Sequence, residues 1–160
     1  MSPTLTGLVD AVATDPAVVE AVRRARLTGT AQATEALDVT APSSYYPMLL
    51  ASLADAGPHA ADRPVLAVTA TAREAEDLAA SLASLLPEES VAEFPGWETL
   101  PHERLSPRSD TVGRRLAVLR RLAGNSELAP PRIIVAPVRA VLQPQVAGLG
   151  ALTPVTVTVG

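Results

Sequence analysis

The chain has 160 residues, 48% of them hydrophobic, and a formal net charge of −4. This length suits one domain with a real core rather than two. The negative charge excludes attraction of nucleic acid over the whole surface and leaves room only for a local basic patch. The absence of Cys excludes disulfides and thiolate metal sites. No apolar run is long enough to span a membrane, so we expect a cytoplasmic protein with no membrane partner.

All 13 basic residues are arginines. The chain therefore has no lysine to bind a nucleotide phosphate, to form a Schiff base or to act as a general base. The serines of the loops lack the Gly-x-Ser-x-Gly setting of a hydrolase nucleophile. We predict no catalytic residue, no cofactor-binding residue and no metal ligand, and so no enzyme activity of the chain itself.

Helix and strand signals alternate along the chain. Asp15 and Pro16 have the order of an N-cap followed by a first-turn proline. Thr71 and Glu74 have the spacing of a capping box, and Gly124 is placed to close the helix that precedes it. The predicted helices cover 5–12, 17–26, 48–55, 72–86, 112–122 and 137–142. We expect Ser109 or Asp110 to cap the helix at 112–122. The predicted strands cover 36–40, 65–69, 90–94, 132–136 and 155–159.

Strands separated by helices predict an α/β fold with a mainly parallel sheet flanked by helices. We assign residues 1–150 to this domain and interpret 143–154 as a linker. The strand at 155–159 has no sequence neighbour to pair with. We therefore expect residues 151–160 to begin a second domain and the chain to be a fragment of a longer protein.

The loop after the first predicted strand is where such folds bind phosphate. A phosphate-binding loop needs glycines, free backbone N–H groups and usually a lysine. This loop has none of the glycines, two prolines and two bulky tyrosines. We therefore expect a degenerate phosphate loop, with its aromatic side chains packed against a neighbouring domain or the sheet edge. Its residues are Ala41, Pro42, Ser43, Ser44, Tyr45, Tyr46 and Pro47.

A proline-rich loop at 94–111 contains the only Phe and the only Trp of the chain. Prolines exclude a helix here, and the large apolar residues exclude a flexible linker. Glu98, His102 and Glu103 could in principle bind a metal or transfer protons, but their spacing matches no known ligand set. We instead expect Glu98, Glu103 and Arg104 to fix the loop by local hydrogen bonds and ion pairs.

Four arginines lie on the helix that follows this loop. Leu116, Leu119 and Leu122 share one face, which we predict to be core, with Arg115 and Arg121 beside it. Arginines suit phosphate contacts, yet a solvated helix face is the more common role of such charges. The candidate residues for interaction are Trp97, Arg104, Arg108, Arg114 and Arg115.

The stretch from Phe94 to Leu116 closely resembles the N-terminal region of bacterial transcription-repair coupling factors (Mfd), with an actinobacterial character. The resemblance extends back through 65–78 and forward through 134–144, and it covers most of residues 37–160. Its Trp-Glu-Thr-Leu-Pro-His-Glu-Arg string is highly specific.

The resemblance implies a degenerate helicase-like (RecA-like) domain similar to that of the excinuclease component UvrB. It implies a scaffold in the module that recruits the excision-repair protein UvrA to RNA polymerase stalled at DNA damage. The partners would be the rest of the same polypeptide and, through the parent protein, UvrA, RNA polymerase and DNA. ATP and Mg would serve a motor of the parent that lies outside this chain.

Two other hypotheses stay open from the residues alone. The first is a nucleic-acid-binding module that uses the arginine helix and Trp97. The second is a small stand-alone α/β enzyme, which the missing catalytic set disfavours.

Overall fold

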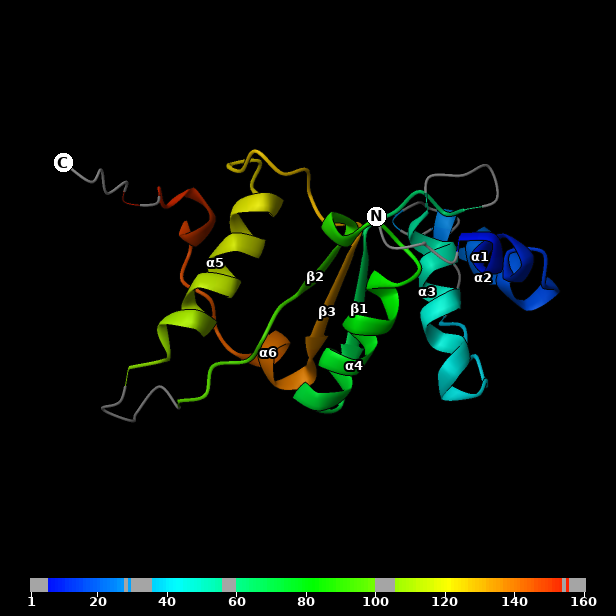
Figure 1. The fold of residues 1–160 in the computed structure, drawn as a ribbon, viewed down its shortest axis with the longest axis horizontal. Coiled ribbons are helices and arrows are strands. Elements are labelled where there is room, and N and C mark those ends of the chain that lie inside the picture. Colours follow the sequence, from blue (N-terminus) through cyan, green and yellow to red (C-terminus); the bar gives the residue numbers. More distant parts are fainter. Residues whose placement is uncertain are drawn as a thin grey trace.

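The computed structural model of the chain describes residues 6–27, 29, 36–55, 60–99, 106–153 and 155 (Figure 1). Its helices are α1 (Thr6–Val12), α2 (Pro16–Leu27), α3 (Tyr46–Ala54), α4 (Ala72–Ala83), α5 (Ser109–Leu122) and α6 (Val138–Leu142). Its strands are β1 (Val65–Thr69), β2 (Val91–Glu93) and β3 (Ile133–Pro137). Three short 3₁₀ helices complete the described elements: η1 (Ser43–Tyr45), η2 (Glu88–Ser90) and η3 (Leu149–Ala151). No described helix is long and apolar enough to cross a membrane.

The described strands form one small parallel sheet in the order β1-β3-β2. Ile133 on the central strand is in register with Val65 on one side and Val91 on the other. β3 is buried on both faces, as its continuous apolar run predicts. The predicted fold class, α/β with a parallel sheet flanked by helices, is therefore confirmed.

Helix α4 covers one face of the sheet. Its Ala75 and Leu82 pack with Ala67, Ile133 and Val135 in the main core cluster. The predicted capping box starts this helix: Thr71 Oγ1 accepts the Glu74 N–H at 3.2 Å, and Glu74 Oε2 accepts the Thr71 N–H at 3.2 Å. The helix ends at Ala83, before the predicted end at 86, but the last two leucines of the segment are still buried in the turn that follows.

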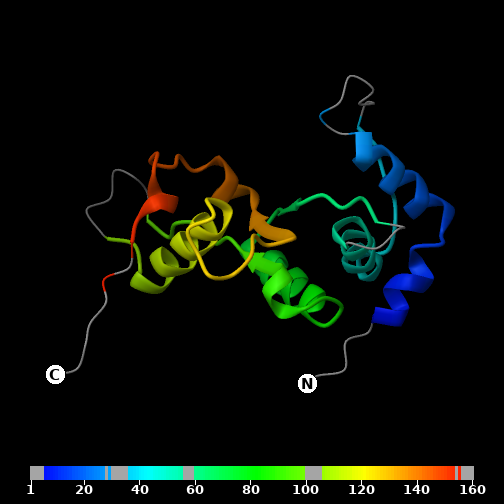
Figure 2. The ribbon, with the colours of Figure 1, turned by 90° about the horizontal axis from the view of Figure 1, so that it is seen from above.

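A second core cluster joins the N-terminal helices to α3. It contains Val18, Ala21 and Val22 of α2 together with Leu49 of α3. Figure 2 shows α1, α2 and α3 grouped at one end of the molecule and α5 at the other, with the sheet and α4 between them. Asp15 caps α2 as predicted, since its Oδ1 accepts the Ala17 N–H at 2.8 Å.

Glu20 on α2 is expected to titrate at an unusually low pH. Hydrogen bonds from Arg23 and then Arg24, both at 2.7 Å from the carboxylate, lower the pKa of Glu20 from 4.5 to about 2. A lowered folded-state pKa means that the stabilisation is present above pH 4.5 and is lost as the pH falls toward 2. An NMR titration of the Glu20 carboxyl should show this midpoint. Arg23→Ala should raise it, whereas the distant Arg73→Ala should leave it unchanged; equal effects would contradict the assignment.

Residues 36–40 do not form the predicted strand. The segment has no regular secondary structure and pairs with no strand in the described chain. Only Val39 packs into the second core cluster, while Leu37 and Asp38 are exposed. The apolar pattern is too short to define a strand without a neighbouring ladder to pair with. Of the strand predicted at 155–159, only Val155 lies within the described residues.

Helix α5 buries a different face from the one predicted. Its buried residues are Thr111, Arg115, Val118 and Arg121, whereas Leu122 is 48% exposed. The helix starts at Ser109, before the predicted start at 112. The predicted cap is wrong: Arg108 is in the N-cap position with no side-chain cap, and Ser109 and Asp110 lie inside the first turn. The predicted C-terminal glycine is confirmed: Gly124 has φ 71°, in the left-handed region that favours glycine.

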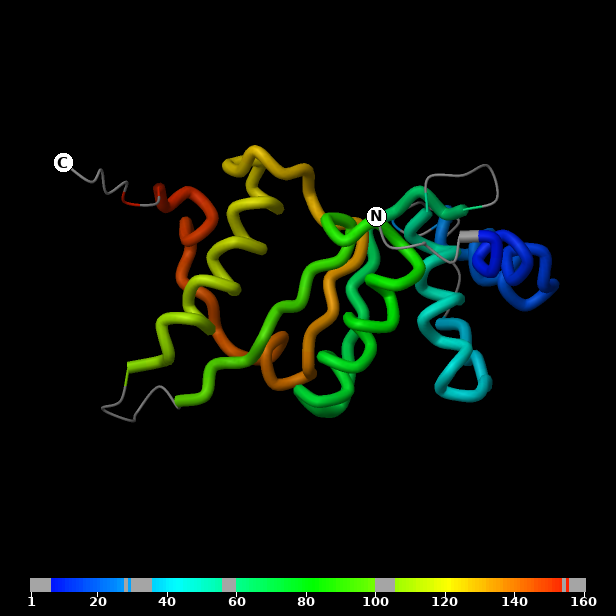
Figure 3. The backbone as a smooth tube through the Cα atoms, viewed as in Figure 1, coloured from blue at the N-terminus to red at the C-terminus, as the bar shows by residue number. Residues whose placement is uncertain are grey.

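The segment predicted as a linker, 143–154, is docked along α5 where the structure describes it. Figure 3 shows the chain leaving α6 and returning beside α5. Asn125 Nδ2 donates to the Gly150 carbonyl at 3.0 Å, and Arg120 donates to the Leu152 carbonyl. A Cβ at Gly150 would lie 2.7 Å from the Leu119 carbonyl oxygen, so only glycine fits this close approach. The domain boundary placed at 150/151 stays a prediction.

Candidate functional sites: the proline loop and the α3–α4 groove

The proline loop is held to α5 by one buried arginine. The guanidinium carbon of Arg115 lies 4.1 Å from the centroid of the Phe94 ring and 4.3 Å from that of the Trp97 ring. Its Nη1 also donates to the Pro95 carbonyl. Arg115 is fully buried, and desolvation lowers its pKa. The only Phe and the only Trp of the chain thus enclose a cation, an arrangement in which ring quadrupole and charge attract.

Two further contacts fix the loop. The Trp97 N–H donates to Gln143 Oε1 at 2.7 Å, and Gln143 Nε2 donates to the Trp97 carbonyl at 3.2 Å. At the start of α5, Thr111 donates its hydroxyl to Glu98. That hydrogen bond is the main cause of the lowered pKa of Glu98, with backbone hydrogen bonds and the charge of Arg108 adding to it. These contacts agree with the expectation that Glu98 fixes the loop.

The candidate arginines have separate roles. Arg114 pairs with Glu93 at 2.6 Å at the end of β2. Arg121, expected at the edge of the leucine face, is buried and donates to the Ala129 and Glu89 carbonyls. Arg108 is exposed. The structure therefore joins Arg115 with Trp97 and places Arg114 and Arg108 apart from that pair. The predicted loop residues that lie outside the described part of the chain are His102, Glu103 and Arg104.

Sequence reasoning missed Gln143 and Phe94 as partners of this site. Gln143 lies 46 positions after Trp97, at the C-cap of α6, so no local pattern connects the two. For Phe94, the signal was available, because a lone aromatic directly before a proline turn is a natural anchor.

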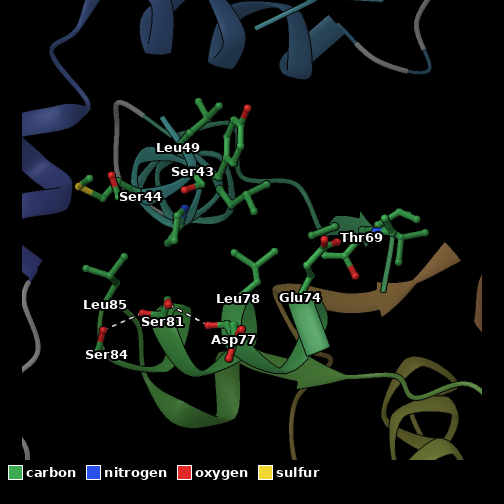
Figure 4. Close-up of a pocket in the computed structure, with 18 of the residues that line it drawn as sticks. Ser43, Ser44, Leu49, Thr69, Glu74, Asp77, Leu78, Ser81, Ser84 and Leu85 are labelled. Carbon is green, nitrogen blue, oxygen red and sulfur yellow. Dashed lines mark hydrogen bonds between the residues drawn. The ribbon is translucent and has the colours of Figure 1, made fainter. Parts of the chain in front are cut away.

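The second candidate site is a groove between α3 and α4. Figure 4 shows Ser43, Ser44 and Leu49 on one wall and Glu74, Asp77, Leu78, Ser81, Ser84 and Leu85 on the other, with Thr69 at the end of β1. The cavity has a volume of ≈ 1090 Å³. Its surface is mostly apolar, and the degenerate phosphate loop forms part of one wall.

The loop at 41–47 offers few backbone donors to a phosphate. Pro42 and Pro47 have no N–H group. The Tyr45 N–H donates to the Pro42 carbonyl at 2.9 Å, and the Tyr46 N–H donates to the Ser43 carbonyl. The turn that starts α3 thus uses amides that a phosphate cradle would need to leave free. Of the two tyrosines, Tyr45 packs within the chain, against the second core cluster.

The charged residues that line the groove are both acidic. They are Glu74 and Asp77, and no described arginine or histidine lines the cavity. In the part of the chain that the structure describes, no group of three acidic or histidine side chains is placed to hold a metal ion. The groove is therefore unfavourable to a polyphosphate, which it would meet with like charge.

Comparison with known proteins places the chain beside two curated relatives. It is 43% identical over 159 residues to proteins described as transcription-repair-coupling factor from Mycobacterium bovis and from Mycobacterium tuberculosis. The match covers 98% of this chain but only 12% of each relative, so the chain spans about one eighth of their length. No protein-family model matches the chain. The resemblance drawn from the proline loop and its flanking segments is thus confirmed.

Proposed function

We propose that this relative of the transcription-repair coupling factors is a structural part of such a protein and has no nucleotide-hydrolysing site of its own. The observation that carries the proposal is the loop at 41–47, whose prolines and turn hydrogen bonds replace a phosphate cradle. The acidic lining of the adjoining groove supports it.

The name of the relatives supports a proposal for the wider role of the chain. Their name links transcription to repair, and we propose that this domain serves as scaffold of the module that recruits the excision-repair protein UvrA to RNA polymerase stalled at DNA damage. ATP and Mg would be used by a motor elsewhere in the same polypeptide. RNA polymerase, DNA and UvrA would be reached through the whole protein.

The geometry favours the scaffold over a nucleic-acid-binding module. Trp97 and Arg115 contact each other, and Arg121 is buried against backbone carbonyls. Side chains engaged in this way are not available to stack on bases or to contact phosphates.

The absence of nucleotide binding can be tested by isothermal titration of the chain with ATP and Mg. We expect no saturable heat up to millimolar nucleotide, because no described cation lines the groove and the loop at 41–47 uses the Tyr45 and Tyr46 amides in its own turn. Binding in the micromolar range that disappears on changing Ser43 to Ala would overturn the proposal. The matched control is Ser126→Ala, an exposed serine in the loop after α5.

A further inference from the structure

Helix α5 is attached to the sheet in a different way from helix α4. α4 buries Ala75 and Leu82 in the main core cluster, whereas neither core cluster of the described chain contains a residue of α5. A single apolar side chain, Val118, is buried among the described residues of α5, and the other buried ones are Thr111, Arg115 and Arg121. The hydrophobic effect therefore contributes less to the attachment of α5 than to that of α4.

The polar contacts that α5 makes toward the sheet are directed at one short segment, 89–98. At the end of the helix, Arg121 donates to the Glu89 carbonyl. At its start, Thr111 donates its hydroxyl to Glu98. The end of the helix thus meets the start of the segment, so the two run in opposite directions, with α5 beside the edge strand β2 (Figure 1).

The middle of this row of contacts contains an incompletely compensated charge. Arg114 pairs with Glu93 with its side chain 41% exposed, so water competes for the pair. Arg115 is fully buried against the rings of Phe94 and Trp97, and its Nε and Nη2 have no acceptor in the described chain. Removing a guanidinium from water without pairing all its donors costs free energy, which is recovered if α5 leaves the segment.

The segment that α5 contacts is itself fixed to the sheet. The Phe94 N–H donates to the Val135 carbonyl of β3 at 2.8 Å, and Trp97 is held by Gln143 at the end of α6. The segment 148–152, by contrast, is tied to Arg120 of α5 and to the loop that follows it. A separation of α5 from 89–98 would therefore leave both rings with the sheet and carry 148–152 away with the helix.

We propose that α5, together with 148–152, is a flap that opens from the sheet as one unit while the sheet, α4 and α6 stay folded. Its contacts with 89–98 are the latch. Opening exchanges mostly polar contacts for water, rehydrates Arg115 and makes the Phe94 and Trp97 rings accessible. Elements held by few buried apolar contacts are the ones that open separately from the rest of a domain. Such a flap goes beyond the scaffold role, which needs no moving part.

Native-state hydrogen exchange of the whole chain, followed by NMR, detects the opening. We expect the α5 amides to be at least about tenfold less protected than those of β3. Their exchange should also depend less steeply on urea concentration, because opening the flap exposes less surface than global unfolding. Equal protection and equal urea dependence of α5 and β3 would overturn the inference.

The decisive variant is Ile133→Val, a mild change at the buried centre of the sheet. It weakens contacts that are present both when the flap is closed and when it is open. We therefore expect it to speed exchange of the β3 amides by about fivefold and to leave the α5 amides unchanged. If Ile133→Val speeds both sets of amides equally, α5 opens only by global unfolding and the flap does not exist.

The matched variant in the latch is Thr111→Val, which removes the hydroxyl that donates to Glu98 and keeps the shape of the side chain. That contact exists only when the flap is closed. Its loss should therefore speed exchange of the α5 amides and of the β3 amides by the same factor, about fivefold. Unchanged α5 exchange in Thr111→Val would show that the contacts with 89–98 do not hold the flap and would overturn the latch.

Discussion

Replacing Arg115 by alanine should lower the free energy of unfolding by about 3 kcal/mol. The change removes a fully buried side chain, two ring contacts and the hydrogen bond to Pro95. The cavity that is left lies between Phe94 and Trp97, so the rings lose the group that they both contact. We expect the proline loop to detach from α5.

Methionine at the same position should be better tolerated. Nε and Nη2 of Arg115 have no hydrogen-bond acceptor in the described chain, so its buried charge is only partly compensated. An apolar side chain of similar length fills the space without that desolvation, and buried charges are often replaced this way at little loss. We expect Arg115→Met to lower stability by about 1 kcal/mol or less.

Urea unfolding followed by tryptophan emission measures both variants. Trp97 is the only Trp of the chain, so its emission reports directly on the loop, and a red shift before unfolding is expected only for Arg115→Ala. The control is Arg114→Ala, whose side chain is partly exposed in its pair with Glu93. Equal losses for the alanine and methionine variants would show that the charge, rather than the volume, holds the loop.

The same change tests the scaffold role in a full-length coupling factor. Arg115→Ala should weaken capture of UvrA while ATP hydrolysis by the motor is unchanged. Unaltered capture by a protein whose loop has demonstrably detached would contradict the scaffold role.

Substituting alanine at two glycines should have opposite effects. At Gly150 a Cβ would lie 2.7 Å from the Leu119 carbonyl oxygen and 2.9 Å from the Ala123 Cβ. Helix backbone cannot move aside, so Gly150→Ala should undock η3 from α5 and cost about 1–3 kcal/mol. Gly113 lies within α5, and nothing lies within 4 Å of its added Cβ. Gly113→Ala should stabilise by about 0.5–1 kcal/mol, because alanine is the better helix former.

Hydrogen exchange locates the effect. The Ala151 and Leu152 amides donate to carbonyls within the 148–152 turn, and their protection should fall in Gly150→Ala but not in Gly113→Ala. Thermal unfolding shows whether each variant is more or less stable than the unmodified chain. Loss of stability without loss of this protection would show that the strain is relieved elsewhere and that the docking is not held by the glycine.

Short sequence patterns were sufficient to predict the capped start of α4 and the strands β1 and β3. The Thr71–Glu74 spacing specifies a capping box because both hydrogen bonds join residues three apart. The apolar runs at 65–69 and 132–136 predict strands covered on both faces. This is confirmed for β3 but wrong for β1, whose Leu66 and Val68 are 54% and 50% exposed. The observed β1 agrees with its prediction, and β3 is shifted by one residue.

The contacts at the proline loop could not be predicted, because they join residues that are distant in the sequence. An arginine beside leucines on α5 carries no sign that Phe94 and Trp97 will enclose it, so the sequence favoured the leucine face and left Arg115 at its edge. The strand predicted at 36–40 was wrong for the same reason, because a strand exists only with a partner to pair with.

The sequence by itself determined the α/β class, the absence of glycine from the loop at 41–47 and of lysine from the chain, and the kinship to coupling factors, since these depend on residue types and short spacings. Only the tertiary structure decided which face of α5 is buried, that 148–152 is docked on it, and that a mostly apolar groove with acidic residues in its lining lies between α3 and α4. Those features arise where side chains from separate elements meet, and their energies depend on contacts that no local pattern encodes.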